Sequence, residues 1–312
     1  MEATTSPRVV VGVDGSAASV RALTYAHAEA TRAGTALRVV HVLPDLDTFG
    51  APFVVPEEDL RQSGRQVVED VLRRAAIPVR AADGGVDVEV VLRHGRPGHV
   101  LVEEAREALL LVVGADRQSL AARLLTGNVT TGVAAGTVAP VVVVPETWPG
   151  AAAAGAPVVV GVEDPGHAFR AIGEACARAD ALGTRVVVLH TWQLPAAYED
   201  AIADRVANEV WAERARRELA PLVAEWSEAF PGVPVQVEVR HGQAAHALVE
   251  ESGTSAELVL GRPAHGIPGT RHLGATARAV LRGAHCPVRV VPPGRTVEVP
   301  PPALHDSHAI VG

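Results

Sequence analysis

The sequence predicts an α/β protein made of two tandem units, each a five-stranded parallel sheet flanked by helices. Three observations lead to this fold class. The chain has 312 residues, enough for about two domains. A series of motifs recurs in order in both halves. Within each half, short apolar runs alternate with longer amphipathic segments, which is typical of parallel strands joined by right-handed helical crossovers.

The internal repeat is clearest in the middle of each unit. Arg93-His94-Gly95 recurs 147 positions later as Arg240-His241-Gly242. Further pairs follow at the same offset: Gly114 and Gly261, Gly127 and Gly274, Pro140 and Pro287. Near the start of each unit the offset is 149, as in Gly12 and Gly161. We therefore assign residues 1–145 to the first unit, 146–156 to a linker, 157–292 to the second unit and 293–312 to a flexible, proline-rich tail.

The first strand, 9–13, is wholly apolar, which indicates burial on both faces as in a parallel sheet. Ser16 is a suitable N-cap for a helix that reaches about residue 32 and is closed by Gly34. The further strands expected in this unit are 37–43, 86–92, 109–113 and 141–144. The further helices are 57–76, 97–107 with Pro97 in its first turn, and 128 to about 135.

The second unit repeats this order, with Asp164 as a helix cap and Pro165 at the first helical position. Its expected strands are 158–162, 185–190, 235–239, 258–260 and 288–291. In such sheets ligands bind at the carboxyl ends of the strands, where the strand order reverses. In the first unit, the loops expected to contact a ligand begin at Asp14, Val42 and Gly114.

Composition excludes several classes of function. The net charge of −8 argues against binding to nucleic acid or an acidic membrane. The chain contains no lysine, which excludes a lysine Schiff base and a lysine-containing P-loop. Cys176 and Cys286 form no C-x-x-C pair, so we expect two buried, inert thiols and no disulfide or zinc site. The polar start and the lack of a long apolar run lead us to expect a cytoplasmic protein.

A glycine motif follows the fourth strand of each unit. It reads Gly114-Ala115-Asp116-Arg117, nine residues, then Gly127-Asn128; the second copy reads Gly261-Arg262-Pro263-Ala264, nine residues, then Gly274-Ala275. This resembles the signature of the universal stress protein family: Gly, two residues, Gly, nine residues, Gly, then Ser or Thr. The strand start 11–16 and the ending 286–291 are similar to the family's opening and closing motifs. The resemblance covers nearly the whole chain and is to the tandem type common in actinobacteria.

The resemblance implies a Rossmann-like fold of the adenine nucleotide alpha hydrolase-like kind. It also implies a stress-response regulatory protein that binds ATP or another adenine nucleotide, with or without Mg²⁺. By family role, Asp14 would contact the nucleoside, and backbone groups near Val42 would contact adenine. The glycine loop and the helix start would hold ribose and phosphates. The implied residues of the first unit are Gly12, Val13, Asp14, Val42, Gly114, Arg117, Gly127, Asn128 and Val129.

This sequence departs from the family pattern in both units. Arg117 stands in place of the second glycine, where it either folds over the phosphates or blocks the site. Asn128 replaces Ser or Thr and can still cap the helix. The second unit departs further, because Glu163 replaces the Asp, and Ala264 and Ala275 replace glycine and the hydroxyl residue. We therefore expect binding in the first unit more than in the second, whose equivalents are Gly161, Glu163, Thr191, Gly261, Gly274, Ala275 and Thr276.

Two alternatives stay open beside nucleotide binding. One is a nucleotide-free protein-interaction module whose glycines only build turns. The other is a weak ATPase in which Asp14 positions a water; without a paired acid, the chain is not predicted to be an enzyme, and we assign no catalytic residues. No metal site is expected from the His94/His99 or His241/His246 pairs, which do not share a helix face. For His41 and His190 we expect packing or a backbone hydrogen bond.

The valine-rich fifth strands, 141–144 and 288–291, are expected at a sheet edge. An exposed row of valines promotes aggregation unless it is paired. We therefore predict that the two units pair through these edges as an intramolecular pseudo-dimer, with a homodimer also possible. The partners implied are an adenine nucleotide and a protein not identified by the sequence.

Overall fold

The computed structural model describes residues 8–43, 56–78, 85–115, 129–193, 205–262 and 273–293. The first unit consists of β1 (Arg8–Val13), α1 (Ala17–Ala33), β2 (Leu37–Leu43), α2 (Glu57–Arg74), β3 (Val88–His94), α3 (Pro97–Glu104), β4 (Ala108–Ala115), α5 (Val129–Gly136) and β5 (Val141–Pro145). The second consists of β6 (Val158–Val162), α6 (Pro165–Leu182), β7 (Val186–Trp192), α8 (Arg205–Ala229), β8 (Val235–His241), α9 (Ala244–Glu251), β9 (Glu257–Gly261), α10 (Ala275–Gly283) and β10 (Val288–Val291). The ten strands expected from the sequence are all present. Among the described helices, none combines the length and the apolar character needed to cross a membrane.

The predicted helix caps are confirmed. The Ser16 hydroxyl oxygen accepts a hydrogen bond from the Ser19 amide, and Gly34 ends α1 with φ +59°, a conformation that favours glycine. In the second unit the Asp164 carboxylate accepts from the Gly166 amide, and Pro165 occupies the first helical position. The two units therefore begin with the same strand–cap–helix arrangement, built from different cap residues.

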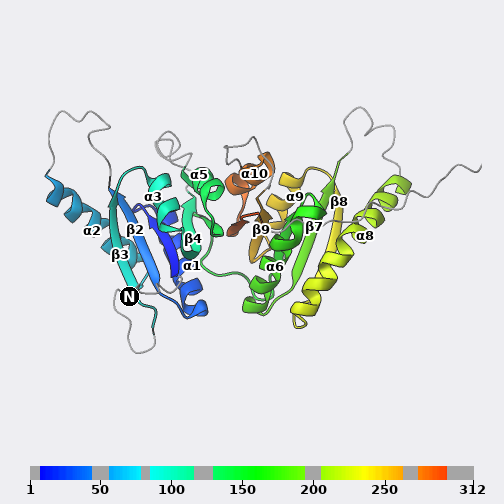
Figure 1. The fold of residues 1–312 in the computed structure, drawn as a ribbon, viewed down its shortest axis with the longest axis horizontal. Helices are drawn as coiled ribbons and strands as arrows, with labels where there is room; N and C mark the ends of the chain where they lie inside the picture. The colour runs from blue at the N-terminus through cyan, green and yellow to red at the C-terminus, as the bar shows by residue number, and fades with distance from the viewer. Residues whose placement is uncertain are drawn as a thin grey trace, which may run out of the picture.

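All ten strands form one continuous sheet, in the order β3-β2-β1-β4-β5-β10-β9-β6-β7-β8. Within each unit the strands are parallel, and the two units meet at β5 and β10, which pair antiparallel with Val142 opposite Arg289. The prediction that the fifth strands pair within one chain is thus confirmed. Figure 1 shows the result, with α2 and β3 at one end of the molecule and β8 and α8 at the other.

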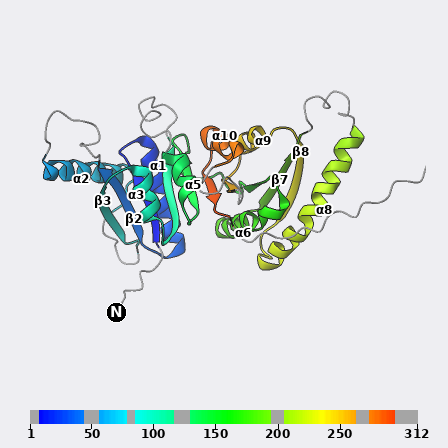
Figure 2. The same cartoon turned by 45° about the horizontal axis from the view of Figure 1, so that its top comes forward.

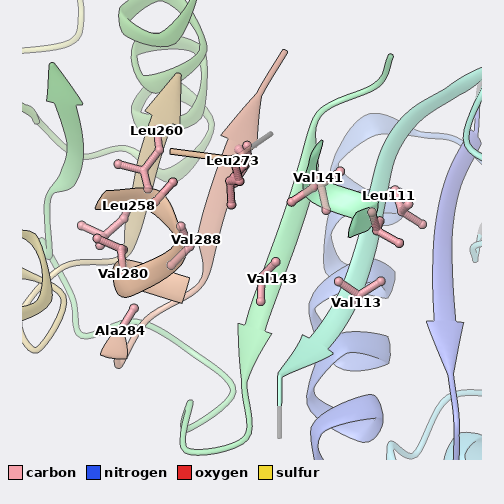
Figure 3. Close-up of a cluster of buried hydrophobic side chains, with 14 of the residues drawn as sticks. Leu111, Val113, Val141, Val143, Leu258, Leu260, Leu273, Val280, Ala284 and Val288 are labelled. Carbon is pink, nitrogen blue, oxygen red and sulfur yellow. The ribbon is translucent and has the colours of Figure 1, made fainter. Parts of the chain in front are cut away.

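Alternate residues of each strand point to opposite faces, and each face has its own core. Val9 and Val11 pack beneath α1 and α2, and a matching core of the second unit lies beneath α6 and α8. Val10 belongs to a third cluster, beneath α3, α5, α9 and α10, that continues from one unit into the other. Figure 2 shows the helices α3, α5, α9 and α10 that cover this face, and Figure 3 shows side chains of β4 and β5 near those of β9, α10 and β10.

On the opposite face, a buried ion network joins the two units. Glu257 of β9 is fully buried and accepts hydrogen bonds from Arg178 Nε at 2.7 Å and from Arg289 Nε at 2.6 Å. It also accepts one from the Tyr25 hydroxyl of α1, in the first unit, at 2.6 Å. Glu29, also on α1, accepts from Arg178 at 2.6 Å and from Arg289 at 3.3 Å. The network therefore links α1 of the first unit to α6, β9 and β10 of the second.

The charges in this network set one another's protonation. Burial alone would raise the pKa of Glu257, but the nearby guanidinium groups of Arg289 and Arg178 outweigh it and hold that pKa below its usual value. Burial and the Glu257 carboxylate raise the pKa of Tyr25 well above its ordinary value. Glu257 is therefore ionised, and Tyr25 is a neutral hydrogen-bond donor, at neutral pH.

Candidate functional site

Five residues predicted for the first site lie at one edge of the sheet. Gly12 and Val13 end β1, and Asp14 directly follows it. β1 lies between β2, which carries Val42, and β4, which carries Gly114. Because these strands are parallel, their carboxyl ends meet at the same edge. Val129 is the first residue of α5. Arg117, Gly127 and Asn128 lie outside the described residues.

The turn after β1 is held by local hydrogen bonds. Asp14 Oδ1 accepts from the Ser16 amide at 3.0 Å and from the Ser16 hydroxyl at 2.6 Å. Gly15 has φ +88°, and its carbonyl accepts from Arg74 of α2 at 2.9 Å. The Asp14 side chain is exposed and directly follows β1, at the edge where the resemblance places a nucleoside.

The two predicted strand-end histidines each make the backbone hydrogen bond expected of them. His41 Nδ1 donates to the Val13 carbonyl at 2.8 Å, and His190 Nδ1 donates to the Val162 carbonyl at 2.9 Å. Since a carbonyl only accepts, the proton lies on Nδ1 in both rings. These histidines fasten the end of the second strand to the end of the first in each unit.

Gly114 has a packing role that requires no ligand. A Cβ at this position would lie 2.6 Å from the carbonyl carbon and oxygen of Ala18. The glycine therefore lets β4 and α1 approach each other closely. Its repeat partner Gly261 differs, because a Cβ there would meet only Ala171, at an ordinary 3.7 Å.

The second unit has a pocket of about 900 Å³ at the carboxyl ends of its strands. This volume lies within the usual range for small-molecule sites. The pocket is bounded by the ends of β6, β7 and β9, the β8–α9 turn, and one face of α10. All seven residues predicted for the second site line it: Gly161, Glu163, Thr191, Gly261, Gly274, Ala275 and Thr276.

The pocket has an apolar wall and a polar rim. Leu189, Leu248 and Leu260 supply apolar surface. The rim carries both carboxylates and cations; its polar residues are Glu163, Asp164, His167, Thr191, Gln193, Gln243, Arg262, Thr276 and Arg282. Such a mixture suits a ligand with a flat apolar part, hydroxyl groups and an anionic end.

The start of α10 is the strongest anion-binding feature of the pocket. Gly274 is the N-cap and has no side chain, so no side-chain hydrogen bond caps the helix. The backbone N–H groups of the first turn have no partner within the helix and carry the positive end of its dipole. Ala275, Ala279 and Arg282 share the helix face that lines the pocket.

Sequence reasoning missed Arg262, Arg282 and Gln193. Arg262 directly follows Gly261, but its repeat partner is Ala115, so comparing the two units gave it no role. Arg282 lies seven residues beyond Ala275, a spacing that returns to the same helix face and was a usable signal. Gln193 lies two residues beyond Thr191, on a strand end whose length the apolar pattern did not reveal.

Both cysteines lie outside this pocket and are buried, as expected. Burial raises the thiol pKa of Cys176 to about 11 and, together with the Glu257 carboxylate, that of Cys286 to about 12. A thiol protonated at neutral pH is a poor nucleophile. The prediction of buried thiols is confirmed.

Comparison with known proteins identifies the fold and the duplication. The model of the universal stress protein family matches twice, over residues 6–145 and 156–292. A universal stress protein of Mycobacterium tuberculosis is 31% identical over 296 residues, which cover 90% of this chain and 96% of the relative. Another, of Mycolicibacterium smegmatis, is 26% identical over 298 residues, covering 94% and 99%. The crystal structure of a universal stress protein from Archaeoglobus fulgidus superposes with a TM-score of 0.62 at 20% identity, covering 92% of this chain and 96% of that one.

Proposed function

Because the chain belongs to the universal stress protein family, we propose that it is a stress-response regulatory protein that binds ATP or another adenine nucleotide in the pocket of its second unit. The observation that carries this proposal is the open start of α10 beside two arginines in a pocket of about 900 Å³. Binding in the first unit stays a prediction from the sequence, since its glycine loop lies outside the described residues.

The three parts of a nucleotide find matching chemistry in the pocket. The phosphates would accept hydrogen bonds from the first-turn amides of α10, an arrangement that holds anions without a lysine. Arg262 and Arg282 would add guanidinium donors, which pair well with phosphate oxygens. The pocket thus offers local positive charge although the whole chain is acidic.

The nucleoside would lie toward the other strands. Glu163 is exposed on the rim at the position equivalent to Asp14, where its carboxylate can accept from ribose hydroxyls. The adenine ring would pack on the apolar wall near Leu189, with polar groups at the end of β7 close to its edge. The additional methylene of Glu163 would bring its carboxylate further into the pocket than an aspartate would reach.

A charge placed at the start of α10 tests this proposal. Ala275 is exposed and lies in the first turn, so Ala275→Glu supplies a carboxylate that the helix dipole stabilises. The same carboxylate would occupy the anion position and repel phosphate, while the fold is kept. We expect calorimetric titration of the full chain with ATP to show one binding site fewer, or affinity at that site lowered by about tenfold or more.

The matched control is Ala275→Gln, which adds almost the same volume without the charge. It should retain most of the ATP affinity. A wild-type chain that takes up no ATP, or an Ala275→Glu variant that binds as the wild type does, would contradict the proposal.

A nucleotide-free interaction module is the second candidate, and one observation favours it. The contact of Gly114 with the Ala18 backbone gives the first glycine motif a purely structural purpose. If the glycines of both motifs serve only to allow close packing and turns, neither motif binds a ligand, and the protein acts through its surface alone. Mass spectrometry of gently purified protein distinguishes the two candidates, since a co-purified adenine nucleotide is expected only for the first.

A further inference from the structure

One side chain of the second pocket reaches into the first unit. Arg262 lines the pocket, and its backbone amide donates to the Val291 carbonyl at 2.8 Å, which fixes its place beside β10. Its Nη1 atom donates to three carbonyl oxygens of the first unit. These belong to Ala134 at 3.2 Å, Ala135 at 2.9 Å and Thr137 at 2.9 Å.

Two of the three acceptors lie in the last turn of α5, and the third, Thr137, directly follows the helix. The last carbonyls of a helix have no partner within it and carry the negative end of its dipole, so a guanidinium group there is a strong cap. Figure 1 shows α5 and α10 facing each other across the boundary between the units. Arg262 therefore joins a pocket of one unit to a helix of the other.

The N-terminal end of α5 adjoins the site predicted for the first unit. Val129, its first residue, directly follows Gly127-Asn128, the pair predicted to hold phosphate in the first unit. α5 has only eight residues, so the cap at its end influences the order of the whole helix. A change at Arg262 can therefore reach the start of α5, beside the predicted first site.

We propose that Arg262 transmits occupancy of the second pocket to α5, so that an adenine nucleotide bound in the second unit orders the helix that follows the first unit's glycine loop. This inference rests on the proposed function. A phosphate that contacts the Arg262 guanidinium restricts the rotamers of this long side chain. The conformational entropy that Arg262 must lose to hold its contacts with α5 has then already been lost, so these contacts form at a smaller cost in free energy. Ligand and α5 cap thus strengthen each other.

The coupling runs through one arginine and is not repeated by symmetry. The residue equivalent to Arg262 in the first unit is Ala115, whose methyl side chain cannot donate a hydrogen bond. By thermodynamic reciprocity, a ligand that orders α5 from the first unit also increases affinity in the second pocket. The duplicated sites are therefore linked by a contact that only the second unit supplies.

Hydrogen–deuterium exchange on the full chain, with and without ATP, tests this link. In the wild type, ATP should slow exchange in peptides covering α10, the ligand's own contact, and in peptides covering α5, by about fivefold or more. In Arg262→Ala, α10 should still be protected by ATP while α5 exchanges at the same rate with and without it. Arg278→Ala is the matched control: it removes an exposed cation of α10 that is not among the residues lining the pocket and that, within the described residues, makes no hydrogen bond to α5, so ATP-dependent protection of α5 should persist.

Ala275→Glu separates this link from direct binding in the first unit, because it leaves Arg262 in place but closes the second pocket to phosphate. Protection of α5 by ATP should disappear in this variant. If α5 protection survives in Ala275→Glu or in Arg262→Ala, or if the wild type shows α10 protected and α5 unchanged, the link is refuted while nucleotide binding stands. If ATP protects neither helix of the wild type and calorimetry shows no binding, the proposed function fails, and the link fails with it.

Discussion

Glu257 shows how a single residue can decide the stability of this protein. It is fully buried and is surrounded by two arginines and a tyrosine. A buried ion pair is costly to form, but it is far more costly to break on one side, because the remaining charge stays buried and unpaired. The network therefore stabilises the protein only while all of its charged partners are present.

We predict that Glu257→Gln destabilises the protein by about 3–5 kcal/mol at neutral pH, because Arg178 and Arg289 lose their shared carboxylate. Urea unfolding at pH 7 measures the loss. The control is Glu89→Gln, whose exposed carboxylate pairs with Arg8 and Arg38 at the surface. That change should cost about 1 kcal/mol or less, and equal costs for both variants would contradict the argument.

The same substitution should alter the response to acid. The folded-state pKa of Glu257 is lowered, so its contribution is complete above its ordinary value near 4.5 and is lost as pH falls below it, through the folded value. Wild-type stability should therefore fall more steeply below pH 4.5 than that of Glu257→Gln. Parallel pH profiles for the two proteins would show that this carboxylate does not titrate in the way the network requires.

The residues that the sequence did not reveal share one property: they break the repeat. Glu257 and Arg289 align with Leu110 and Val142 of the first unit, as Arg262 aligns with Ala115. Comparing the two copies of a repeat identifies residues that both units need for the same fold. It does not identify residues that make contacts only at the boundary between the units, where one unit differs from the other. A charged residue in an apolar strand was a usable sign, since it requires a buried partner.

At the scale of elements, the sequence predicted the number and order of strands well and their ends less well. The third strand extends to His94, and the seventh to Trp192, beyond the apolar runs. The reason is that backbone pairing continues past the buried side chains: His94 pairs with Leu43, and Trp192 with His241. An apolar pattern detects burial and cannot detect a hydrogen-bond ladder that continues toward solvent.

Gly114, next to the last residue of β4, and Gly261, the last residue of β9, should respond differently to the same substitution. Neither has a positive φ, so the difference comes from space alone. Gly114→Ala places a Cβ against the Ala18 backbone, which cannot move independently of α1, and should cost about 1–3 kcal/mol. Gly261→Ala meets only the Ala171 methyl and should change stability by less than about 1 kcal/mol. Urea midpoints of the two variants check this, and a Gly261→Ala loss as large as that of Gly114→Ala would be inconsistent with the packing described.

At the scale of the whole molecule, several independent contacts, besides that of Arg262 with α5, make one body of two units. β5 and β10 pair through backbone hydrogen bonds, one apolar core extends beneath both units, and the ion network of Glu257 closes the opposite face. This pairing also covers the valine-rich edge strand of each unit, which removes a site of aggregation. The linker between β5 and β6 is therefore not what holds the units together.

This last point leads to a prediction about a cut chain. Residues 151–155 are exposed, so a protease recognition sequence inserted there should be cleaved without disturbing β6. After cleavage we expect the halves to elute together in size-exclusion chromatography, and the unfolding midpoint to become dependent on protein concentration, as for a dimer. Adding Glu257→Gln to the cleavable chain should release the halves at concentrations where the parent stays associated, because the α1–β9 contact is then incomplete. Separation of the parent halves on cleavage would mean that covalent connection, and not the shared interface, maintains the arrangement.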